Sequence, residues 1–228
     1  MNTCCKAVIF DLDGTLHDTI KDLGSSMNYI LEKCDFPIHE EEHYVRAIGN
    51  GLRNLAKRSF PESAVTDELL DKTVPEFIEH YGNHCIEKTV VYEGIDELLE
   101  FCTKNNILLS ILSNKRDDLV KELTPHYFPD YEFKYAMGEL SQFPRKPDPT
   151  SALYLAEMLG VLPSDILFIG DSIYDIRTGK NAGMKTLAVT WGYQPKEQLV
   201  AENPDFIADS PAQIIEYIKR INGGINNG

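Results

Sequence analysis

Two aspartates follow a short apolar run near the start of the sequence. The run, residues 7–10, includes β-branched side chains and predicts a buried strand, and Gly14 ends the pattern just after Asp11 and Asp13. Because side chains alternate along an extended chain, the two carboxylates can point to the same side. Paired carboxylates repel unless a cation lies between them, and hard oxygen ligands suit Mg²⁺. The alternative is a strand followed by an ordinary acidic turn.

Three later stretches carry other polar groups that phosphoryl transfer needs. They are Ser113-Asn114-Lys115, Lys146-Pro147-Asp148-Pro149 and the run from Gly170 and Asp171 to Asp175. With the first motif they offer carboxylates for a metal, a hydroxyl and amides for phosphate oxygens, and a lysine. Each also has a structural alternative: a helix cap for Ser113, an exposed side chain for Lys146, and capping or solvated roles for Asp171 and Asp175.

The elements that must position these groups alternate between strands and helices. Strands are predicted at 107–112, 133–137, 166–169, 186–190 and 206–208, with helices at 95–104, 117–123, 150–159, 174–182 and 212–221. This alternation implies a parallel sheet with right-handed crossovers, whose ligands bind beyond the carboxyl ends of the strands. Residues 17–88 contain helical patterns and no convincing strand, so they are expected to form an insert over that functional edge.

The composition of the chain limits the kinds of binding partner and the cellular compartment that we expect. The chain has 228 residues and a formal net charge of -14, which disfavours binding to nucleic acid and to anionic membranes. No secretory signal or membrane-spanning run is evident, and the five cysteines form no metal-binding CxxC pair or disulfide framework. We therefore expect a cytoplasmic protein, with no nucleic-acid or membrane partner, that is a monomer or a homodimer.

The four motifs resemble, in the same order, those of the haloacid dehalogenase superfamily and its phosphoglycolate phosphatase-like branch. Residues 11–15 match the DxDGT pattern, Ser113 the Ser/Thr motif, Lys146 the motif lysine and 170–175 the GDxxxD motif. The resemblance covers essentially the whole chain. It implies an α/β fold with a Rossmann-like parallel-sheet core, residues 1–16 and 89–228, and an inserted α-helical cap domain, residues 17–88.

The resemblance also implies roles for the two carboxylate motifs. Asp11 is expected to be the nucleophile that forms an aspartyl-phosphate, and Asp13 the general acid and then the general base. Mg²⁺ would bind the carboxylates of Asp11 and Asp171 and the backbone carbonyl of Asp13. Asp175, four residues after Asp171, would support the metal site from the first turn of a helix.

The remaining motif residues are expected to contact the substrate. Ser113 and Asn114 would hydrogen-bond the phosphoryl oxygens, and Lys146 would offset the charge of the phosphate and of Asp11. Lys115 and Arg116 are expected to be solvated. His17 follows the first motif, where an apolar residue is commoner in the family, and we leave open whether it touches the substrate or the hinge of the insert.

The insert is expected to carry substrate choice. Its turn Gly49-Asn50-Gly51, followed by Leu52 and Arg53, resembles the specificity loop of phosphoglycolate phosphatases. Arg53 is a candidate for binding a substrate carboxylate, because a guanidinium can hold one in a bidentate way. The alternative is an arginine on the surface of a helix.

These observations predict a Mg²⁺-dependent phosphomonoester hydrolase. Its substrate would be a small phosphorylated metabolite, with phosphoglycolate as the leading candidate. A sugar-phosphate mutase of the β-phosphoglucomutase kind shares all four motifs and is the nearest alternative. A non-catalytic interaction protein on the same fold is the second alternative, against which the complete acidic set argues, since a binding protein has no need of these carboxylates.

Overall fold

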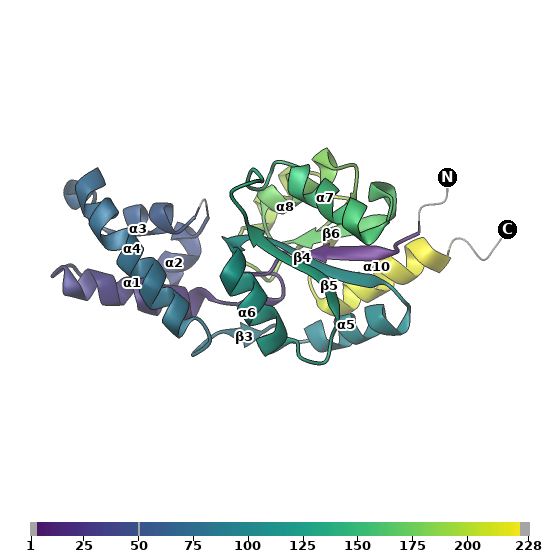
Figure 1. Ribbon diagram of the computed structural model, residues 1–228, viewed down its shortest axis with the longest axis horizontal. Helices are drawn as coiled ribbons and strands as arrows, with labels where there is room; N and C mark the ends of the chain where they lie inside the picture. Colours follow the sequence, from purple (N-terminus) through teal and green to yellow (C-terminus); the bar gives the residue numbers. More distant parts are fainter. Residues whose placement is uncertain (1–3, 50, 224–228) are drawn as a thin grey trace. The chain divides into compact units, whose positions relative to one another are not determined.

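The computed structural model describes residues 4–49 and 51–223, which fall into two compact units (Figure 1). The first unit joins the chain up to His17 with the chain from Val91 onward, and the second is Asp18–Val90. The short strands β2 (His17–Asp18) and β3 (Val90–Val91) pair where the chain passes between the units. The sequence did not predict them, because two residues are too few for a periodic pattern.

The first unit is built on a six-stranded sheet in the order β5-β4-β1-β6-β7-β8, and its strand pairs are parallel. The strands are β1 (Ala7–Phe10), β4 (Leu108–Arg116), β5 (Phe133–Glu139), β6 (Ile166–Gly170), β7 (Lys185–Val189) and β8 (Phe206–Ala208). Strand β1 lies between β4 and β6, and Phe10 stands opposite Ile111 and Ile169. The predicted parallel-sheet α/β fold is therefore confirmed.

Alternation along β1 explains why helices cover both faces of this sheet. Val8 and Phe10 pack into one buried cluster with side chains of α5 (Ile95–Lys104) and α10 (Pro211–Gly223). Ala7 and Ile9 point the other way, into a cluster with α7 (Thr150–Leu159). Figure 1 shows α7 and α8 (Ile173–Asn181) on one face, and α5, α6 (Asp117–Tyr127) and α10 on the other. A strand buried on both faces reads as a continuous apolar run, as 7–10 does.

Several elements of the first unit differ from the sequence prediction; helix α6, for example, runs to Tyr127 instead of Leu123. Strand β4 continues past the apolar run through Ser113 to Arg116, and helix α9 (Lys196–Ala201) was not predicted. The end of β4 is polar because it lies at the carboxyl edge of the sheet, where side chains line a site instead of a core. A six-residue helix with one buried residue, Leu199, carries too little periodicity to be recognised.

The second unit consists of α-helices that each bury one face and of a short 3₁₀ helix whose residues are not buried. They are α1 (Ile20–Lys33), α2 (Glu41–Ala47), α3 (Leu52–Ser59), α4 (Asp67–His84) and the short 3₁₀ helix η1 (Glu62–Ala64). Helix α1 packs against α4, and both carry buried side chains three and four positions apart. Thr66 is the N-cap of α4, and its hydroxyl accepts a hydrogen bond from the Leu69 amide at 3.1 Å.

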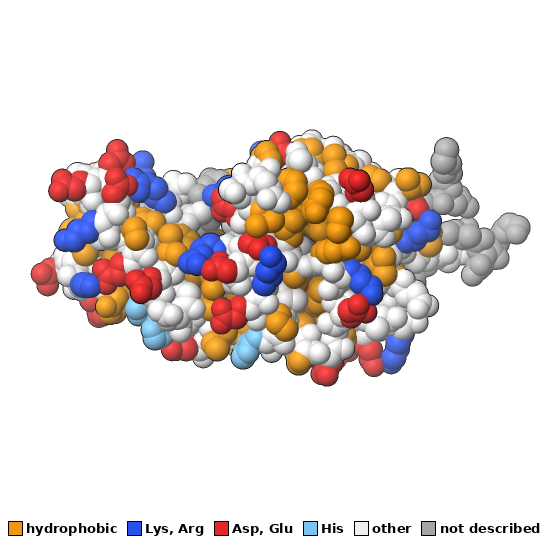
Figure 2. All heavy atoms as spheres, viewed as in Figure 1, with side chains coloured by type: hydrophobic (Ala, Val, Ile, Leu, Met, Phe, Trp, Pro, Cys, Tyr) orange, Lys and Arg blue, Asp and Glu red, His pale blue; other side chains and the backbone are white. Residues whose placement is uncertain are grey.

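The surface mixes charges of both signs with apolar atoms. Figure 2 shows acidic and basic side chains interspersed on the face in view, with hydrophobic side chains gathered over the region of α7. The exposed apolar residues of that helix are Leu153, Tyr154 and Met158. Across residues 4–49 and 51–223, no helix has both the length and the apolar character that crossing a membrane requires.

Candidate active site

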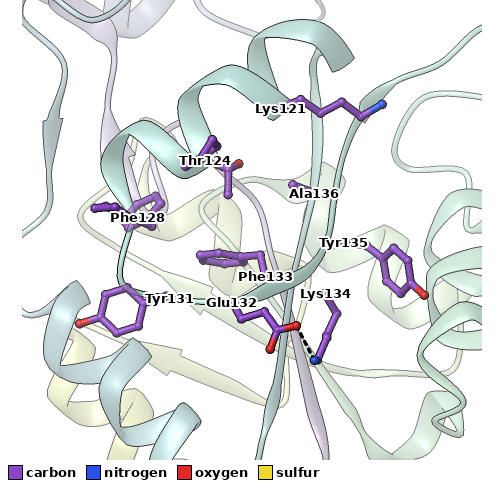
Figure 3. Close-up of a pocket in the computed structure, with 11 residues that line it drawn as sticks. Lys121, Thr124, Phe128, Tyr131, Glu132, Phe133, Lys134, Tyr135 and Ala136 are labelled. Carbon is purple, nitrogen blue, oxygen red and sulfur yellow. Dashed lines mark hydrogen bonds and ion pairs between the residues drawn. The ribbon is translucent and has the colours of Figure 1, made fainter.

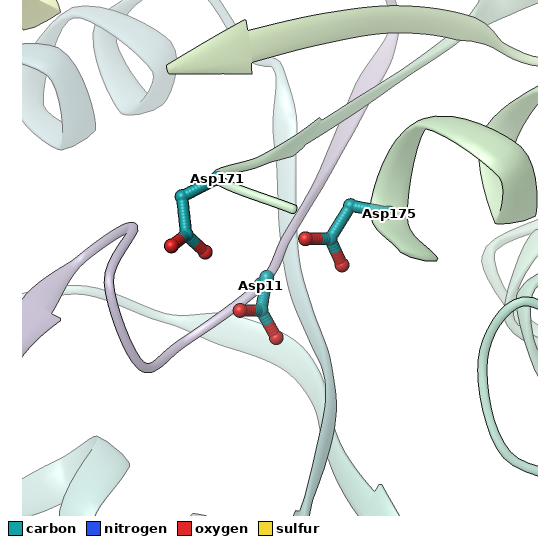
Figure 4. A group of neighbouring side chains, drawn as sticks. All are labelled: Asp11, Asp171 and Asp175. Atoms are coloured by element: carbon teal, nitrogen blue, oxygen red, sulfur yellow. The ribbon is translucent and has the colours of Figure 1, made fainter. Parts of the chain in front are cut away.

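Three carboxylates converge at the carboxyl edge of the sheet (Figure 4). Asp11 follows β1, Asp171 follows β6, and Asp175 lies in the first turn of α8. One oxygen from each lies within 4.8 Å of the others, and all three residues are buried. Because β1 and β6 are adjacent and parallel, their carboxyl ends must meet at one edge, which brings together residues 160 positions apart in the sequence.

A capping box fixes the direction of Asp175. Ser172 is the N-cap of α8, and its amide donates to Asp175 Oδ2 at 3.0 Å while its hydroxyl also contacts that oxygen. The amide of Asp175 donates in turn to the Ser172 hydroxyl at 3.4 Å. Such reciprocal bonds satisfy the free amides of a helix start. The capping role that the sequence offered as an alternative for Asp175 is therefore present, together with its place in the carboxylate group.

Lys146 links two of the three carboxylates. Its Nζ lies 2.7 Å from Asp11 Oδ1 and 2.5 Å from Asp175 Oδ1, and it donates to the Leu112 carbonyl at 3.0 Å. Its side chain is 4% exposed, which excludes the alternative of a surface lysine. The amide of Lys146 donates to Asn114 Oδ1 at 3.0 Å, and Asn114 Nδ2 donates back to the Lys146 carbonyl at 3.3 Å. Asn114, predicted to touch phosphate, thus holds the backbone of Lys146 in this structure.

One ammonium group cannot balance three buried carboxylates. Burial raises the pKa of Asp11, and although Lys146 lowers it, the charge of Asp175 raises it further. Burial and the charges of Asp11 and Asp175 hold the pKa of Asp171 well above its ordinary value. A divalent cation would reduce this repulsion, and carboxylate oxygens are among the hard ligands that suit Mg²⁺. The three residues therefore fit a hard divalent cation.

Asp171 is enclosed by two loops that end at the same edge. Its Oδ2 accepts from the Tyr193 amide at 2.7 Å, and Oδ1 lies 3.5 Å from the Thr15 hydroxyl. Gly14 adopts a φ of +89°, and a Cβ there would lie 2.4 Å from Asp171 Oδ2. Only glycine satisfies both the positive φ and this close approach. The sequence did not predict this contact of Tyr193.

Asp13 belongs to a separate charge group. Lys115 Nζ lies 3.0 Å from its Oδ1 and 3.2 Å from its Oδ2, and His17 Nε2 lies 3.1 Å from Oδ1. Although burial raises the pKa of Asp13, the charge of Lys115 and the hydrogen bonds from His17 and Lys115 lower it below its ordinary value. The Lys115 side chain is 5% exposed, so the expectation that it is solvated is wrong.

Ser113 lies in strand β4 and not at a helix start. It is buried, and its hydroxyl accepts from the Lys115 amide at 3.3 Å. The alternative of a helix cap therefore does not hold. Asp11 directly follows Phe10, and Ser113 lies two residues after Ile111, the partner of Phe10 on β4, so both residues lie at the edge where β1 ends.

The second unit holds the specificity residues that the sequence predicted. Gly49 has a φ of +111°, as a tight turn requires, whereas Asn50 lies outside the described residues. Arg53 NH1 lies 2.6 Å from Asp71 Oδ1, and its NH2 lies 3.2 Å from Asp67 Oδ1. Its guanidinium therefore carries carboxylate partners from α4. The predicted role of Arg53 toward a substrate stays a prediction.

A separate hollow lies beside the edge strand β5 (Figure 3). It has a volume of about 510 Å³ and is lined by α6, β5 and the loop between them, including Phe128, Phe133 and the ion pair of Lys134 with Glu132. The motif residues do not line it. The carboxylates, lysines and hydroxyl at the carboxyl edge of the sheet are instead the groups that can perform chemistry.

Comparison with known proteins agrees with the fold and the motifs. The family model for haloacid dehalogenase-like hydrolases matches residues 8–189. A phosphoglycolate phosphatase of Pseudomonas savastanoi pv. phaseolicola is 32% identical over 214 residues, covering 92% of this chain and 78% of that protein. One from Haemophilus influenzae is 30% identical over 224 residues, covering 96% of this chain and 100% of that protein. A crystal structure from Lactobacillus delbrueckii subsp. bulgaricus superposes with a TM-score of 0.86 at 30% identity, covering 95% and 99% of the two chains. The chain therefore belongs to the haloacid dehalogenase-like hydrolases.

Proposed function

We propose that this enzyme is a Mg²⁺-dependent phosphomonoester phosphatase that acts through an aspartyl-phosphate, with phosphoglycolate as its leading substrate. The observation that carries the proposal is the buried contact of Lys146 with both Asp11 and Asp175 beside Asp171. This arrangement combines a carboxylate nucleophile, a fixed cation and a set of metal ligands. The names of the relatives support the substrate, since the two described above, 32% and 30% identical to this chain, are named phosphoglycolate phosphatase.

The proposed reaction has two displacements at phosphorus. In the first, an oxygen of Asp11 attacks, the bond from phosphorus to the leaving oxygen breaks, and Asp13, which takes up a proton from water when substrate is bound, donates it to that oxygen. In the second, Asp13 removes a proton from water, which attacks the aspartyl-phosphate and releases phosphate and free Asp11. Throughout, Lys146 and Ser113 offset charge on the phosphoryl oxygens. Mg²⁺, bound by Asp11, Asp171 and the Asp13 carbonyl with Asp175 in support, would neutralise further negative charge.

We also propose that the unit Asp18–Val90 acts as the cap and selects the substrate. A cap that closes would exclude bulk water from the site. The phosphoryl group must be transferred to a single water molecule, so this exclusion would favour the reaction. The helical unit offers Arg53, whose side chain is 46% exposed, as the group for a substrate carboxylate. To bind a substrate, this guanidinium would exchange its contacts with Asp67 and Asp71 for the new carboxylate.

The test of the proposed function is phosphate release from a panel of substrates with and without Mg²⁺. The panel contains phosphoglycolate, sugar phosphates, nucleoside monophosphates and pyrophosphate. A Mg²⁺-dependent preference for phosphoglycolate is the expected result. Weak phosphate release from many compounds would agree with the proposed reaction but would exclude phosphoglycolate as the preferred substrate. An isomerised sugar phosphate without phosphate release would identify a mutase instead.

Removing the guanidinium of Arg53 is expected to weaken binding of phosphoglycolate. An Arg53→Ala variant should raise KM for this substrate by about tenfold, because the substrate carboxylate would lose its paired, charge-assisted hydrogen bonds, while kcat changes less. Steady-state kinetics of the variant measure both constants. The exposed Arg46 of α2 provides the matched control, since Arg46→Ala should leave KM unchanged. Equal KM values for both variants and the parent enzyme would remove Arg53 from the substrate site.

Binding of Mg²⁺ is expected to stabilise the folded protein in the absence of any substrate. At a concentration about 100 times its Kd, a ligand adds about 2.7 kcal/mol, which for a chain of this size corresponds to about 5–10 °C in the unfolding midpoint. Thermal unfolding in Mg²⁺, against NaCl of the same ionic strength, measures the shift. In Asp171→Asn the shift should be largely lost, since one carboxylate ligand is gone. An undiminished shift in that variant would place the cation elsewhere.

A further inference from the structure

The buried side chains of Lys115 and His17 contact Asp13. Neither has a role in the reaction described above. Lys115 Nζ contacts both carboxylate oxygens, at 3.0 and 3.2 Å, and His17 Nε2 contacts Oδ1 at 3.1 Å. The His17 side chain has no exposed surface. An ionised carboxylate only accepts hydrogen bonds, so His17 must present Nε2 as an N–H donor to it. Three contacts on two oxygens define the plane and direction of the Asp13 carboxylate.

The backbone holds both donors in place. His17 is four residues after Asp13, and the amide of Gly14 donates to the His17 carbonyl at 2.9 Å. The rings of His17 and of Tyr127 on α6 form a T-shaped pair, with centroids 5.4 Å apart. Lys115 lies near the end of β4, where a Cβ on Gly138 of β5 would come within 2.5 Å of its carbonyl oxygen. This tight contact between neighbouring strands leaves the Lys115 backbone little freedom.

The two lysines contact different carboxylates of the site. Lys146 binds Asp11 and Asp175, whereas Lys115 binds Asp13. Without a cation of its own, the Asp13 carboxylate would be attracted to Lys146 and to a metal held by the other three carboxylates. A carboxylate drawn toward that group could not also reach the leaving oxygen.

We propose that Lys115 and His17 are positioning residues for Asp13, which keep its carboxylate apart from the metal-binding carboxylates and aimed at the leaving oxygen. This inference rests on the proposed function, because it requires Asp13 to be the general acid. It assigns no contact with the substrate to either residue. Both act through Asp13, so their loss should matter only where the reaction needs a proton.

The leaving group provides a readout that a structural role would not move. An alkoxide leaves poorly without a proton, whereas p-nitrophenolate is stable enough to leave unprotonated. The ratio kcat/KM reports only the steps up to loss of the leaving group, so later hydrolysis of the aspartyl-phosphate does not enter. We compare kcat/KM for phosphoglycolate, ethyl phosphate and p-nitrophenyl phosphate in the full-length, Mg²⁺-loaded enzyme.

In Lys115→Met we expect kcat/KM to fall about 10²-fold for both alkyl phosphates and less than about tenfold for p-nitrophenyl phosphate. His17→Leu should show the same pattern with a smaller amplitude, and Lys115→Arg should restore part of the loss. In an Asp13→Asn background, Lys115→Met should add little, since residues that act as one unit are not additive. The exposed Lys121 supplies the control variant Lys121→Met, which should match the parent enzyme.

Other outcomes would overturn the inference in distinguishable ways. An equal loss for alkyl and aryl substrates in Lys115→Met and His17→Leu would mean that these residues act on the fold or on general charge. A rise in KM confined to phosphoglycolate, with ethyl phosphate unaffected, would make Lys115 a ligand of the substrate carboxylate. If Asp13→Asn itself shows no dependence on the leaving group, or the parent enzyme hydrolyses none of the three, the proposed function fails first and the inference falls with it.

Discussion

Replacing Asp11 by Asn is expected to abolish phosphomonoester hydrolysis, with kcat lowered by at least about 10⁴-fold. An amide of the same shape occupies the same space but is a poor nucleophile, and it cannot form the acyl-phosphate that divides the reaction into two displacements. Acid-quenched reactions with ³²P-labelled substrate test the step directly, since the label should be retained by the parent protein and not by the variant.

The same substitution should not unfold the protein. Burial and the charge of Asp175 raise the pKa of Asp11 despite the opposing effect of Lys146, so a neutral group at this position relieves repulsion. We expect the unfolding midpoint without metal to be unchanged or higher. Asp130→Asn, at an exposed site, is the control for the loss of one negative charge. Retained turnover and retained label in Asp11→Asn would show that another group is the nucleophile.

Replacing Lys146 by Met is expected to cost both stability and activity. The variant keeps an unbranched side chain only one atom shorter but leaves Asp11 and Asp175 buried without their shared cation. Removing one partner of a buried ion pair typically costs about 3–5 kcal/mol, and losing a fixed cation at the phosphoryl oxygens should lower kcat about 10²–10³-fold. Urea denaturation in the absence of divalent metal measures the free energy of unfolding, and phosphate release in saturating Mg²⁺ measures the rate.

The pH dependence of the stability of Lys146→Met distinguishes the loss of a charge from the loss of packing. Burial already raises the pKa of Asp11 in the parent protein, and removing Lys146 should raise it more. A group whose folded pKa is above its unfolded value binds protons more tightly when folded, so the deficit should shrink as the pH falls through the folded pKa. A deficit independent of pH would indicate lost packing instead. Lys121→Met, where 63% of the lysine side chain is exposed, should change stability by less than about 0.5 kcal/mol.

The sequence alone predicted the features that depend on short segments. A strand of four apolar residues followed by Asp11, Asp13 and Gly14 predicts that a pair of carboxylates lies just beyond the end of this strand. The four-residue spacing of Asp171 and Asp175 specifies a loop and the first turn of a helix. Alternation of strands and helices then requires a parallel sheet, whose carboxyl ends meet at one edge. Local patterns and one topological rule were therefore enough for the fold class and for the candidates that could meet there.

The tertiary structure decided which of these groups touch one another. Lys115 and Asp13 are 102 residues apart and meet because β4 lies beside β1, and the polar end of β4 looked in the sequence like a solvated loop. The side-chain amide of Asn114 is a group that could hydrogen-bond a phosphate, yet it hydrogen-bonds the backbone of Lys146. No periodicity encodes such pairings, because the free energy of a buried charge depends on every neighbour brought to it by strand order and register. The sequence determined which polar side chains are available to the site. The packing of distant segments decided that these side chains form two charge groups, one around Lys146 and one around Asp13.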